Sequence, residues 1–183
     1  MIRRPALFLD RDGVINIDRN YVYTRENFEF VDGIFELCRE AKRLGYHVFV
    51  ITNQAGIARG YYTEEDFRVL TEWMRNVFIL EGCEISMVYY SPYHPEHGLG
   101  KYKCDTDCRK PKPGMILRAS DDFCVDIGGS LLIGDKASDI EAGVAAGIGR
   151  NLLFSPAPAV ELEEKSGKQT AILNSLVEAI SFL

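Results

Sequence analysis

The sequence lacks the features of a membrane protein or a nucleic-acid-binding protein. Its 183 residues include no apolar run approaching the roughly 20 residues that cross a bilayer as a helix. Basic residues are outnumbered, with 21 Lys and Arg against 27 Asp and Glu, so the formal net charge is −6. Nucleic-acid-binding proteins usually show the opposite balance. We therefore expect no membrane partner and no nucleic-acid partner.

Cysteine is scarce and its number is odd. The five cysteines are scattered along the chain as Cys38, Cys83, Cys104, Cys108 and Cys124. The N-terminus is weakly similar to an export signal, but its apolar stretch is short and ends at Asp10. Scattered cysteines without an export signal indicate reduced thiols, so a cytoplasmic protein is expected. No surface feature of the sequence demands a dimer, and we expect a monomer.

The sequence does contain a short apolar run that ends abruptly in two aspartates. Residues 6–9 are too few for a helix and predict a buried strand, after which come Asp10, Asp12 and the turn residue Gly13. Open α/β sheets bind their ligands beyond the carboxyl ends of such strands. Two close carboxylates repel each other unless a cation lies between them, and Mg²⁺ prefers such oxygen ligands. Taken alone, the motif fits a solvated acidic turn equally well.

Four further apolar runs predict the rest of a sheet, at residues 46–51, 85–90, 131–133 and 151–154. Helical spacing of apolar residues predicts helices over 33–44, 63–78, 136–146 and 169–182. Strands that alternate with helices indicate a doubly wound α/β fold, with a mainly parallel sheet and helices on both faces. We expect residues 1–183 to form a single domain, because no insertion is long enough for a second one.

Polar residues follow three of these strands at the point where each apolar run stops. In chain order they are Asp10 and Asp12, then Thr52, Asn53 and Gln54, then Asp135 and Lys136. Because parallel strands end at one edge of the sheet, these side chains are predicted to meet there. Together with Arg109 and Lys110, they combine acids that suit a metal with cations and hydroxyls that suit an anion. Such a set favours phosphoryl transfer, where an aspartate can be the nucleophile and a second carboxylate the general acid and base.

Four of these motifs resemble those of the haloacid dehalogenase superfamily: Asp10-x-Asp12-Gly13-Val14, Thr52, Lys110 and Gly134-Asp135-x-x-x-Asp139. More narrowly, residues 8–13, 52–60 and 108–115 resemble the D-glycero-D-manno-heptose 1,7-bisphosphate phosphatases, with which histidinol-phosphate phosphatases share much. The resemblance covers about residues 6 to 150. It implies a core of the superfamily's fold without a large cap domain.

The resemblance implies a role for each matching residue. Asp10 is the expected nucleophile and Asp12 the general acid and base, while Asp10, the Asp12 carbonyl and Asp135 are expected to hold Mg²⁺. Thr52 and Lys110 are expected to bind the transferring phosphoryl group, with Asp139 orienting Lys110. Arg109 is expected to bind the second phosphate of a bisphosphate. The remaining substrate contacts are expected from Asp18, Arg19, Asn20, Tyr21, Asn53, Gln54, Ala55 and Lys136.

The activity that the resemblance implies is Mg²⁺-dependent hydrolysis of the 7-phosphate of the heptose bisphosphate, through an aspartyl-phosphate, in nucleotide-activated heptose biosynthesis. Another substrate, such as histidinol phosphate or a different sugar phosphate, remains open. A non-catalytic module that binds phosphorylated ligands is a third hypothesis. The intact set of catalytic residues argues against that module, since a protein that only binds would be free to lose them.

The resemblance does not extend to the loop between Tyr90 and Arg109, where these phosphatases usually carry a structural Zn²⁺ ion. The four ligand positions hold Ser91, Tyr93, Thr106 and Cys108, of which only the last is a normal zinc ligand. A shifted set has suitable ligand types, but both pairs would have to move: His94, His97, Cys104 and Cys108. We therefore expect Mg²⁺ but no structural Zn²⁺.

Overall fold

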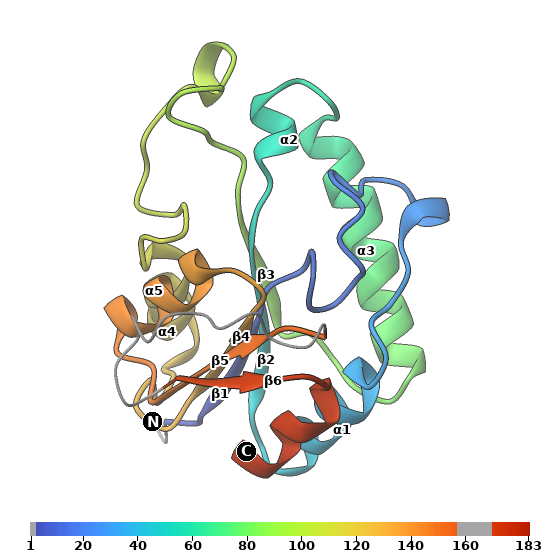
Figure 1. Cartoon of the computed structure of the whole chain (residues 1–183), viewed down its shortest axis with the longest axis vertical. Coiled ribbons are helices and arrows are strands. Elements are labelled where there is room, and N and C mark those ends of the chain that lie inside the picture. Colours follow the sequence, from blue (N-terminus) through green and yellow to red (C-terminus); the bar gives the residue numbers. More distant parts are fainter. Residues whose placement is uncertain (1–2, 157–169) are drawn as a thin grey trace.

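The computed structural model describes residues 3–156 and 170–183, and its centre is one six-stranded parallel sheet (Figure 1). The strand order is β3-β2-β1-β4-β5-β6, and every neighbouring pair is parallel. The strands are β1 (Ala6–Leu9), β2 (His47–Asn53), β3 (Met87–Ser91), β4 (Leu131–Gly134), β5 (Arg150–Phe154) and β6 (Thr170–Leu173). The prediction of a mainly parallel, doubly wound sheet is confirmed.

Helices cover both faces of the sheet (Figure 1). They are α1 (Ile34–Arg43), the short α2 (Ala55–Ala58), α3 (Glu64–Leu80), α4 (Gly114–Phe123) and α5 (Ala137–Ala146). Three 3₁₀ segments join them: Arg25–Asn27, Gly100–Tyr102 and Leu176–Phe182. Buried residues of α1, α3 and the last 3₁₀ segment share one core cluster, and those of α4 and α5 share the other. The described part of the chain contains no second sheet.

The strands are apolar on both faces because both faces are covered. Along β1, Leu7 and Leu9 belong to the core cluster beneath α1 and α3, whereas Ala6 and Phe8 belong to the cluster beneath α4 and α5. This alternation follows from the two-residue period of a strand, and it explains why the sequence shows a continuous apolar run rather than an alternating one.

Helix α3 shows how local sequence sets an element's start. The Thr63 hydroxyl accepts from the Asp66 backbone N–H, and the Asp66 carboxylate accepts in return from the Thr63 N–H, which together form a capping box. Phe67, Leu70 and Met74 then fall on the buried face, as predicted. Glu64 in the first turn also suits the positive end of the helix dipole.

The predicted closing helix over residues 169–182 is wrong, as far as the described residues show. Residues 170–173 form β6, which pairs in parallel with β5, and only Leu176–Phe182 is helical, as a 3₁₀ segment. The neighbouring strand offered backbone partners that helical spacing of apolar residues could not reveal. Helix α4 is missing from the prediction although Met115, Ile116 and Ala119 form a buried face, because the two prolines and Gly114 at its start are typical of a turn.

The sheet reverses its order between β1 and β4, which are neighbours although β2, β3 and the helices α1 to α4 separate them in the chain. Crevices at such a reversal, outside the carboxyl ends of the strands, are where doubly wound folds bind ligands. Asp10 and Asp135 follow these two strands directly. No helix among the described residues is both long enough and apolar enough to cross a membrane.

Candidate active site

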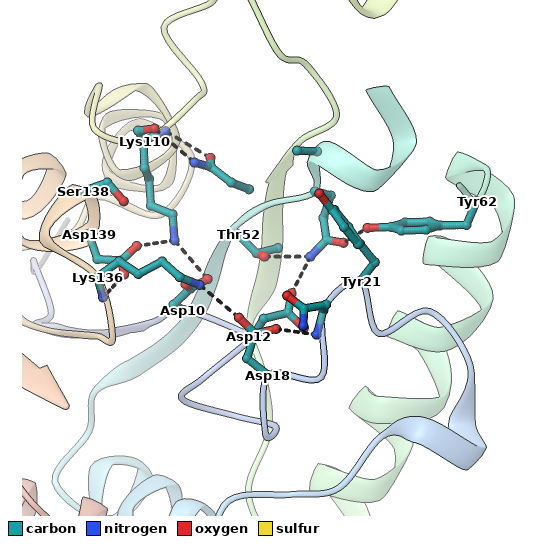
Figure 2. A pocket seen from close by; sticks show the side chains of 14 residues that line it. Asp10, Asp12, Asp18, Tyr21, Thr52, Tyr62, Lys110, Lys136, Ser138 and Asp139 are labelled. Atoms are coloured by element: carbon teal, nitrogen blue, oxygen red, sulfur yellow. Dashed lines mark hydrogen bonds and ion pairs between the residues drawn. The ribbon is translucent and has the colours of Figure 1, made fainter. Parts of the chain in front are cut away.

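A pocket of about 280 Å³ opens at the carboxyl ends of β1 and β2, beside the end of β4 (Figure 2). Most of the predicted site residues line it: Asp10, Asp12, Asp18, Asn20, Tyr21, Thr52, Asn53, Gln54, Ala55, Lys110 and Lys136. The residues come from the loop after β1, the end of β2 and the start of α2, the loop after β4 and the segment before α4. The fold therefore gathers residues that lie up to 126 positions apart, from Asp10 to Lys136.

Lys110 connects the two sides of this pocket. Its Nζ lies 2.9 Å from Asp10 Oδ1 and 2.5 Å from Asp139 Oδ1, and it donates to the Ile51 carbonyl at 2.8 Å. Its backbone is clamped to the end of β2, since its N–H donates to Asn53 Oδ1 and its carbonyl accepts from Asn53 Nδ2. The Asn53 side chain thus holds Lys110 at the end of β2, where the Lys110 ammonium group contacts the carboxylates of Asp10 and Asp139 (Figure 2).

Burial and charge together set the protonation behaviour of this group. Burial, together with the smaller effects of the Asp139 and Asp135 carboxylates, raises the pKa of Asp10 to about 7 against the opposing charge of Lys110. Burial also raises the pKa of Asp135. For Lys110, burial favours the neutral amine, but the charges of Asp10 and Asp139 outweigh burial and raise its pKa. The buried group of Asp10, Asp139 and Lys110 thus has more carboxylates than cations.

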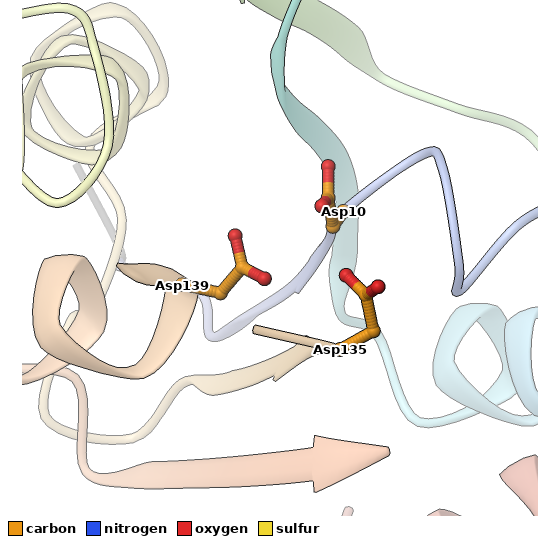
Figure 3. Close-up of side chains that lie close together, drawn as sticks. All are labelled: Asp10, Asp135 and Asp139. Carbon is orange, nitrogen blue, oxygen red and sulfur yellow. The ribbon is translucent and has the colours of Figure 1, made fainter. Parts of the chain in front are cut away.

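A divalent cation fits this excess of negative charge. Asp10, Asp135 and Asp139 each offer a carboxylate oxygen, and these three atoms lie within 4.8 Å of one another (Figure 3). Asp135 Oδ1 is buried and has no hydrogen-bond partner among the described residues. Gly13, with a φ of 96°, makes this approach possible, because a Cβ there would lie 2.3 Å from Asp135 Oδ2. An all-oxygen set beside a phosphate-sized pocket is the donor chemistry that Mg²⁺ prefers.

Asp12 occupies the opposite wall of the pocket, where three side chains donate to its carboxylate. Arg11 Nη2 lies 2.8 Å and 2.9 Å from its two oxygens, Asn16 Nδ2 lies 3.1 Å from Oδ1, and Gln54 Nε2 lies 3.1 Å from Oδ2. The Gln54 amide also donates to the Thr52 hydroxyl at 2.8 Å. Gln54 therefore links the Asp12 carboxylate, which follows β1, to the Thr52 hydroxyl on β2.

The loop after β1 forms a further side of the pocket. Asp18 accepts from Lys136 Nζ at 3.2 Å, which joins this loop to the start of α5. Asn20 and Tyr21 both have a φ of 60°, a backbone conformation that side chains seldom adopt outside functional loops. Tyr21 meets Tyr61 edge to face, with ring centroids 4.8 Å apart. The predicted substrate loop is thus held at both ends of its pocket-facing part.

Two predicted substrate residues do not line the pocket. Arg19 is exposed and pairs with Glu29, so its guanidinium is engaged elsewhere. Arg109 donates to the Tyr93 carbonyl at 3.0 Å. Burial, and secondarily the positive charge of Arg59, lower the pKa of Arg109. Arg19 therefore does not reach the pocket, whereas Arg109 directly precedes the lining residue Lys110 in the chain.

Two lining residues were missed by sequence reasoning, Tyr62 and Ser138. The Tyr62 hydroxyl donates to Gln54 Oε1 at 2.5 Å and its ring stacks on Tyr23, with centroids 5.1 Å apart. The available signal was Gly56, where a Cβ would lie 2.1 Å from the Tyr62 ring. Ser138 lies between Lys136 and Asp139 at the start of α5. Its position within the Gly134-Asp135-x-x-x-Asp139 motif is the sequence signal for its place in the pocket wall.

The loop that follows β3 is held without charges at the positions expected for zinc ligands. Cys108 Sγ lies 3.1 Å from Thr106 Oγ1 and 3.5 Å from Ser91 Oγ, so three of the four positions meet in a hydrogen-bonded group. In the shifted set, His94 and His97 stack on each other, but Cys104 is exposed and its thiol contacts the Asp105 carbonyl. Among the described residues, the only gathered set of potential metal ligands is that of the three aspartates.

Comparisons with known proteins agree with this geometry. A family model described as HAD-hydrolase-like matches residues 107–179. The chain is 59% identical to D-glycero-alpha-D-manno-heptose-1,7-bisphosphate 7-phosphatase of Burkholderia mallei, over 84% of this chain and 81% of that protein. It is 44% identical to D-glycero-beta-D-manno-heptose-1,7-bisphosphate 7-phosphatase of Vibrio cholerae, over 98% of this chain and 96% of that protein.

Among solved structures, the D,D-heptose 1,7-bisphosphate phosphatase of B. bronchiseptica, complexed with magnesium and phosphate, superimposes with a TM-score of 0.82. It is 24% identical and covers 97% of this chain and 96% of that one, so it supports the fold. The higher identities to the curated relatives extend over 84% and 98% of this chain. The chain therefore belongs to the haloacid dehalogenase-like hydrolases, within the family of the heptose-1,7-bisphosphate 7-phosphatases.

Proposed function

We propose that this chain hydrolyses the 7-phosphate of D-glycero-D-manno-heptose 1,7-bisphosphate with Mg²⁺ as its cofactor, as a step of nucleotide-activated heptose biosynthesis. The observation that carries the proposal is the buried group in which Lys110 bridges Asp10 and Asp139, beside Asp12 and Thr52 and at a set of carboxylates that suits a divalent cation. The names of the curated relatives supply the substrate.

Asp10 is the nucleophile in this proposal. Its carboxylate attacks the phosphorus atom, the bond from phosphorus to the C7 oxygen breaks, and an aspartyl-phosphate forms. Asp12, as the acid, gives its proton to the departing C7 oxygen. In the second half-reaction a water molecule gives a proton to the Asp12 carboxylate and its oxygen attacks the phosphorus atom. The bond to Asp10 then breaks, and phosphate is released.

The remaining groups balance charge and hold the phosphoryl group. Lys110 and the Thr52 hydroxyl face its oxygens, and Asp139 keeps Lys110 protonated and oriented. Mg²⁺, when held by Asp10, Asp135 and the Asp12 carbonyl, would neutralise negative charge on the phosphoryl oxygens. Asp139 then acts through Lys110 rather than as a metal ligand. This division of roles explains why the pocket contains more carboxylates than its two lysines, Lys110 and Lys136, balance.

The sugar and the second phosphate fall to the rim of the pocket. Asp18, Asn20 and Tyr21 face the space where a sugar attached to the phosphoryl group would extend. Arg109, whose side chain donates to the Tyr93 carbonyl and has no carboxylate among its described partners, is available for the distal phosphate. We also propose that the protein acts as a cytoplasmic monomer; light scattering that reports a dimer would contradict the oligomeric part.

The experiment is phosphate release from a panel of esters, with Mg²⁺ and with EDTA. The panel contains both anomers of the heptose bisphosphate, histidinol phosphate, fructose 1,6-bisphosphate and a hexose monophosphate. We expect a heptose bisphosphate to give the highest kcat/KM, and EDTA to abolish turnover. The two relatives are named for opposite anomers, so the panel also decides which one this chain prefers. A higher kcat/KM for histidinol phosphate would overturn the substrate, and full activity in EDTA would overturn the cofactor.

A further inference from the structure

Arg11 is a buried cation that the mechanism above leaves without a role. Its side chain is only 1% exposed, although it lies between the two aspartates of the pocket. Nη2 donates to both oxygens of Asp12 and to the Val22 carbonyl at 2.6 Å. Nε and Nη1 are buried and have no hydrogen-bond partner among the described residues, and the guanidinium lies 5.7 Å from the centroid of the Phe67 ring.

Asp12 is the single carboxylate that pairs with this guanidinium in the described part of the chain. A buried charge is very costly unless an opposite charge and hydrogen bonds compensate it. Rotation of Asp12 away from Arg11 would leave the arginine with only the Val22 carbonyl and an aromatic face. The charge of Arg11 therefore penalises every Asp12 rotamer except the one that the structure shows.

The other two donors complete this restraint from the pocket side. Asn16 Nδ2 and Gln54 Nε2 each contact one oxygen of Asp12, so the carboxylate is held from three directions. Its side chain is still 18% exposed and lines the pocket, whereas Arg11 does not line it. Arg11 therefore has no access to the phosphate or the sugar, and any effect on the reaction has to pass through Asp12.

We propose that Arg11 is a positioning residue that fixes the Asp12 carboxyl group at the pocket wall for proton transfer to and from the reacting oxygens. This inference rests on the proposed function, because it assigns Arg11 to the general acid and base of that reaction. Proton transfer by a placed carboxyl group contributes about 10²- to 10⁴-fold to a rate, and misplacement forfeits part of that factor. The proton itself moves between Asp12 and the substrate or water oxygen.

The test uses Arg11→Met and two esters whose leaving groups differ in basicity. The C7 alkoxide of the heptose bisphosphate needs a proton to depart, whereas 4-nitrophenolate does not. We expect Arg11→Met to lower kcat for the heptose bisphosphate about 10- to 100-fold, with KM changed by less than about two-fold. The rate constant of the pre-steady-state burst of 4-nitrophenol from 4-nitrophenyl phosphate reports attack by Asp10 alone. In Arg11→Met this rate constant should fall less than about three-fold.

A double-mutant cycle separates positioning from general damage to the fold. Asp12→Asn should lower the heptose bisphosphate rate strongly, and adding Arg11→Met in that background should lower it no further. Arg11→Lys keeps the charge but not the planar guanidinium that lies over the Phe67 ring, so it should restore part of the rate. Arg43→Met, a surface arginine paired with Glu40, is the matched control and should leave both substrates unaffected.

Two results would overturn the proposal. One is an equal loss, in Arg11→Met, of the burst rate constant and of heptose bisphosphate turnover. The other is a further loss when Arg11→Met is added to Asp12→Asn, since either would show that Arg11 serves the fold or the phosphate site. If Arg11→Met does not fold, the double variant Arg11→Met with Asp12→Asn is used instead, because it buries no unpaired charge. The comparison of its turnover with that of Arg11→Lys then tests the same proposal. Full heptose bisphosphate turnover by Asp12→Asn would instead refute the acid–base role in the proposed function.

Discussion

The edge of the sheet and the loop that follows β3, which leads to Arg109 and Lys110, are held by different physical means. At the edge, buried groups carry full charges, as in the contacts of Lys110 with Asp10 and Asp139. In the loop over residues 92–108, the contacts include neutral pairs such as Cys108 with Thr106 and the His94 N–H with the Tyr102 carbonyl, and ion pairs such as Asp105 with Lys112 are exposed. The loop also rests on α3, where Glu64 accepts from the hydroxyls of Tyr90 and Tyr102.

This difference teaches where the sequence of the protein can change at low cost. A buried ion pair loses several kcal/mol, roughly 3–5, when one partner is removed, because the other charge stays buried and unpaired. A half-exposed hydroxyl–thiol contact can be exchanged for water at far smaller cost. We therefore expect substitutions at the edge of the sheet to change the rate of the reaction. Substitutions in the loop over residues 92–108 should change substrate preference or have no measurable effect.

The largest effect is expected for Asp10→Asn. An amide is not nucleophilic, so no aspartyl-phosphate forms, and turnover should fall more than about 10⁴-fold while the fold is kept. The measurement is phosphate release together with acid quench and mass spectrometry of the intact protein. Undiminished phosphate release by this variant would refute Asp10 as the nucleophile.

Asp12→Ala is expected to have the next largest effect, a loss of about 10²- to 10⁴-fold. Both half-reactions should slow, because the same carboxyl group gives a proton in the first and accepts one in the second. With an activated ester the second half-reaction limits the rate, so a trapped aspartyl-phosphate should accumulate. If the variant kept its rate at saturating Mg²⁺ and lost only metal affinity, Asp12 would have to be reassigned to the metal site.

Arg109→Ala sharpens the comparison between the edge and the loop, since Arg109 joins the two. The loss of a charge-assisted contact to the distal phosphate should lower kcat/KM for the heptose bisphosphate about 10- to 100-fold, mainly through KM. A hexose monophosphate has no second phosphate, so its kcat/KM should change less than about three-fold. Equal losses for both substrates would place Arg109 at the transferring phosphoryl group instead.

Asp10 is also expected to cost stability in the metal-free protein. Burial raises its pKa to about 7 from an unfolded value near 3.8. Between these values the folded state binds more protons, so the free energy of unfolding should fall as pH rises from about 4 through 7. Asp10→Asn removes this effect and should stabilise the metal-free protein by about 1–3 kcal/mol at pH 8.

The check is urea unfolding of both proteins in EDTA across pH 4 to 8. The difference should vanish toward pH 4, where Asp10 is already neutral. At pH 8 the difference in free energy of unfolding should be smaller than the raised pKa of Asp10 alone implies, because Asp10→Asn also removes one charged partner of Lys110. A stability difference that does not change with pH would show that the Asp10 charge is not its cause.

The smallest effect is expected in the loop, where Cys104→Ser and Cys108→Ser should leave Mg²⁺-dependent turnover and the unfolding midpoint nearly unchanged. The reason is that a structural Zn²⁺ site normally needs four Cys or His ligands, and only one of the family positions retains one. Elemental analysis of the purified protein is the direct measurement. About one zinc per chain, lost in the double serine variant, would refute the prediction and favour the shifted set with His94 and His97.

The sequence by itself determined the sheet and the chemistry of its edge. Buried parallel strands must be apolar on both sides, so residues 6–9, 46–51 and 131–133 were recognisable, and the polar residues that end them were bound to lie at one edge. Asp10, Thr52 and Asp135 lie there in the structure. Local capping also sufficed for α3, because the Thr63–Asp66 box involves only neighbouring residues.

Only the tertiary structure decided which distant groups meet. That residues 170–173 form β6 depends on β5 as a partner, and local spacing of apolar residues carries no information about that partner. The engagement of Arg19 with Glu29 and the place of Tyr62 in the pocket depend on loop paths. The pairing of Arg11 with Asp12 depends on burial by β1, Val22 and Phe67, because a guanidinium in water would gain little from the same carboxylate.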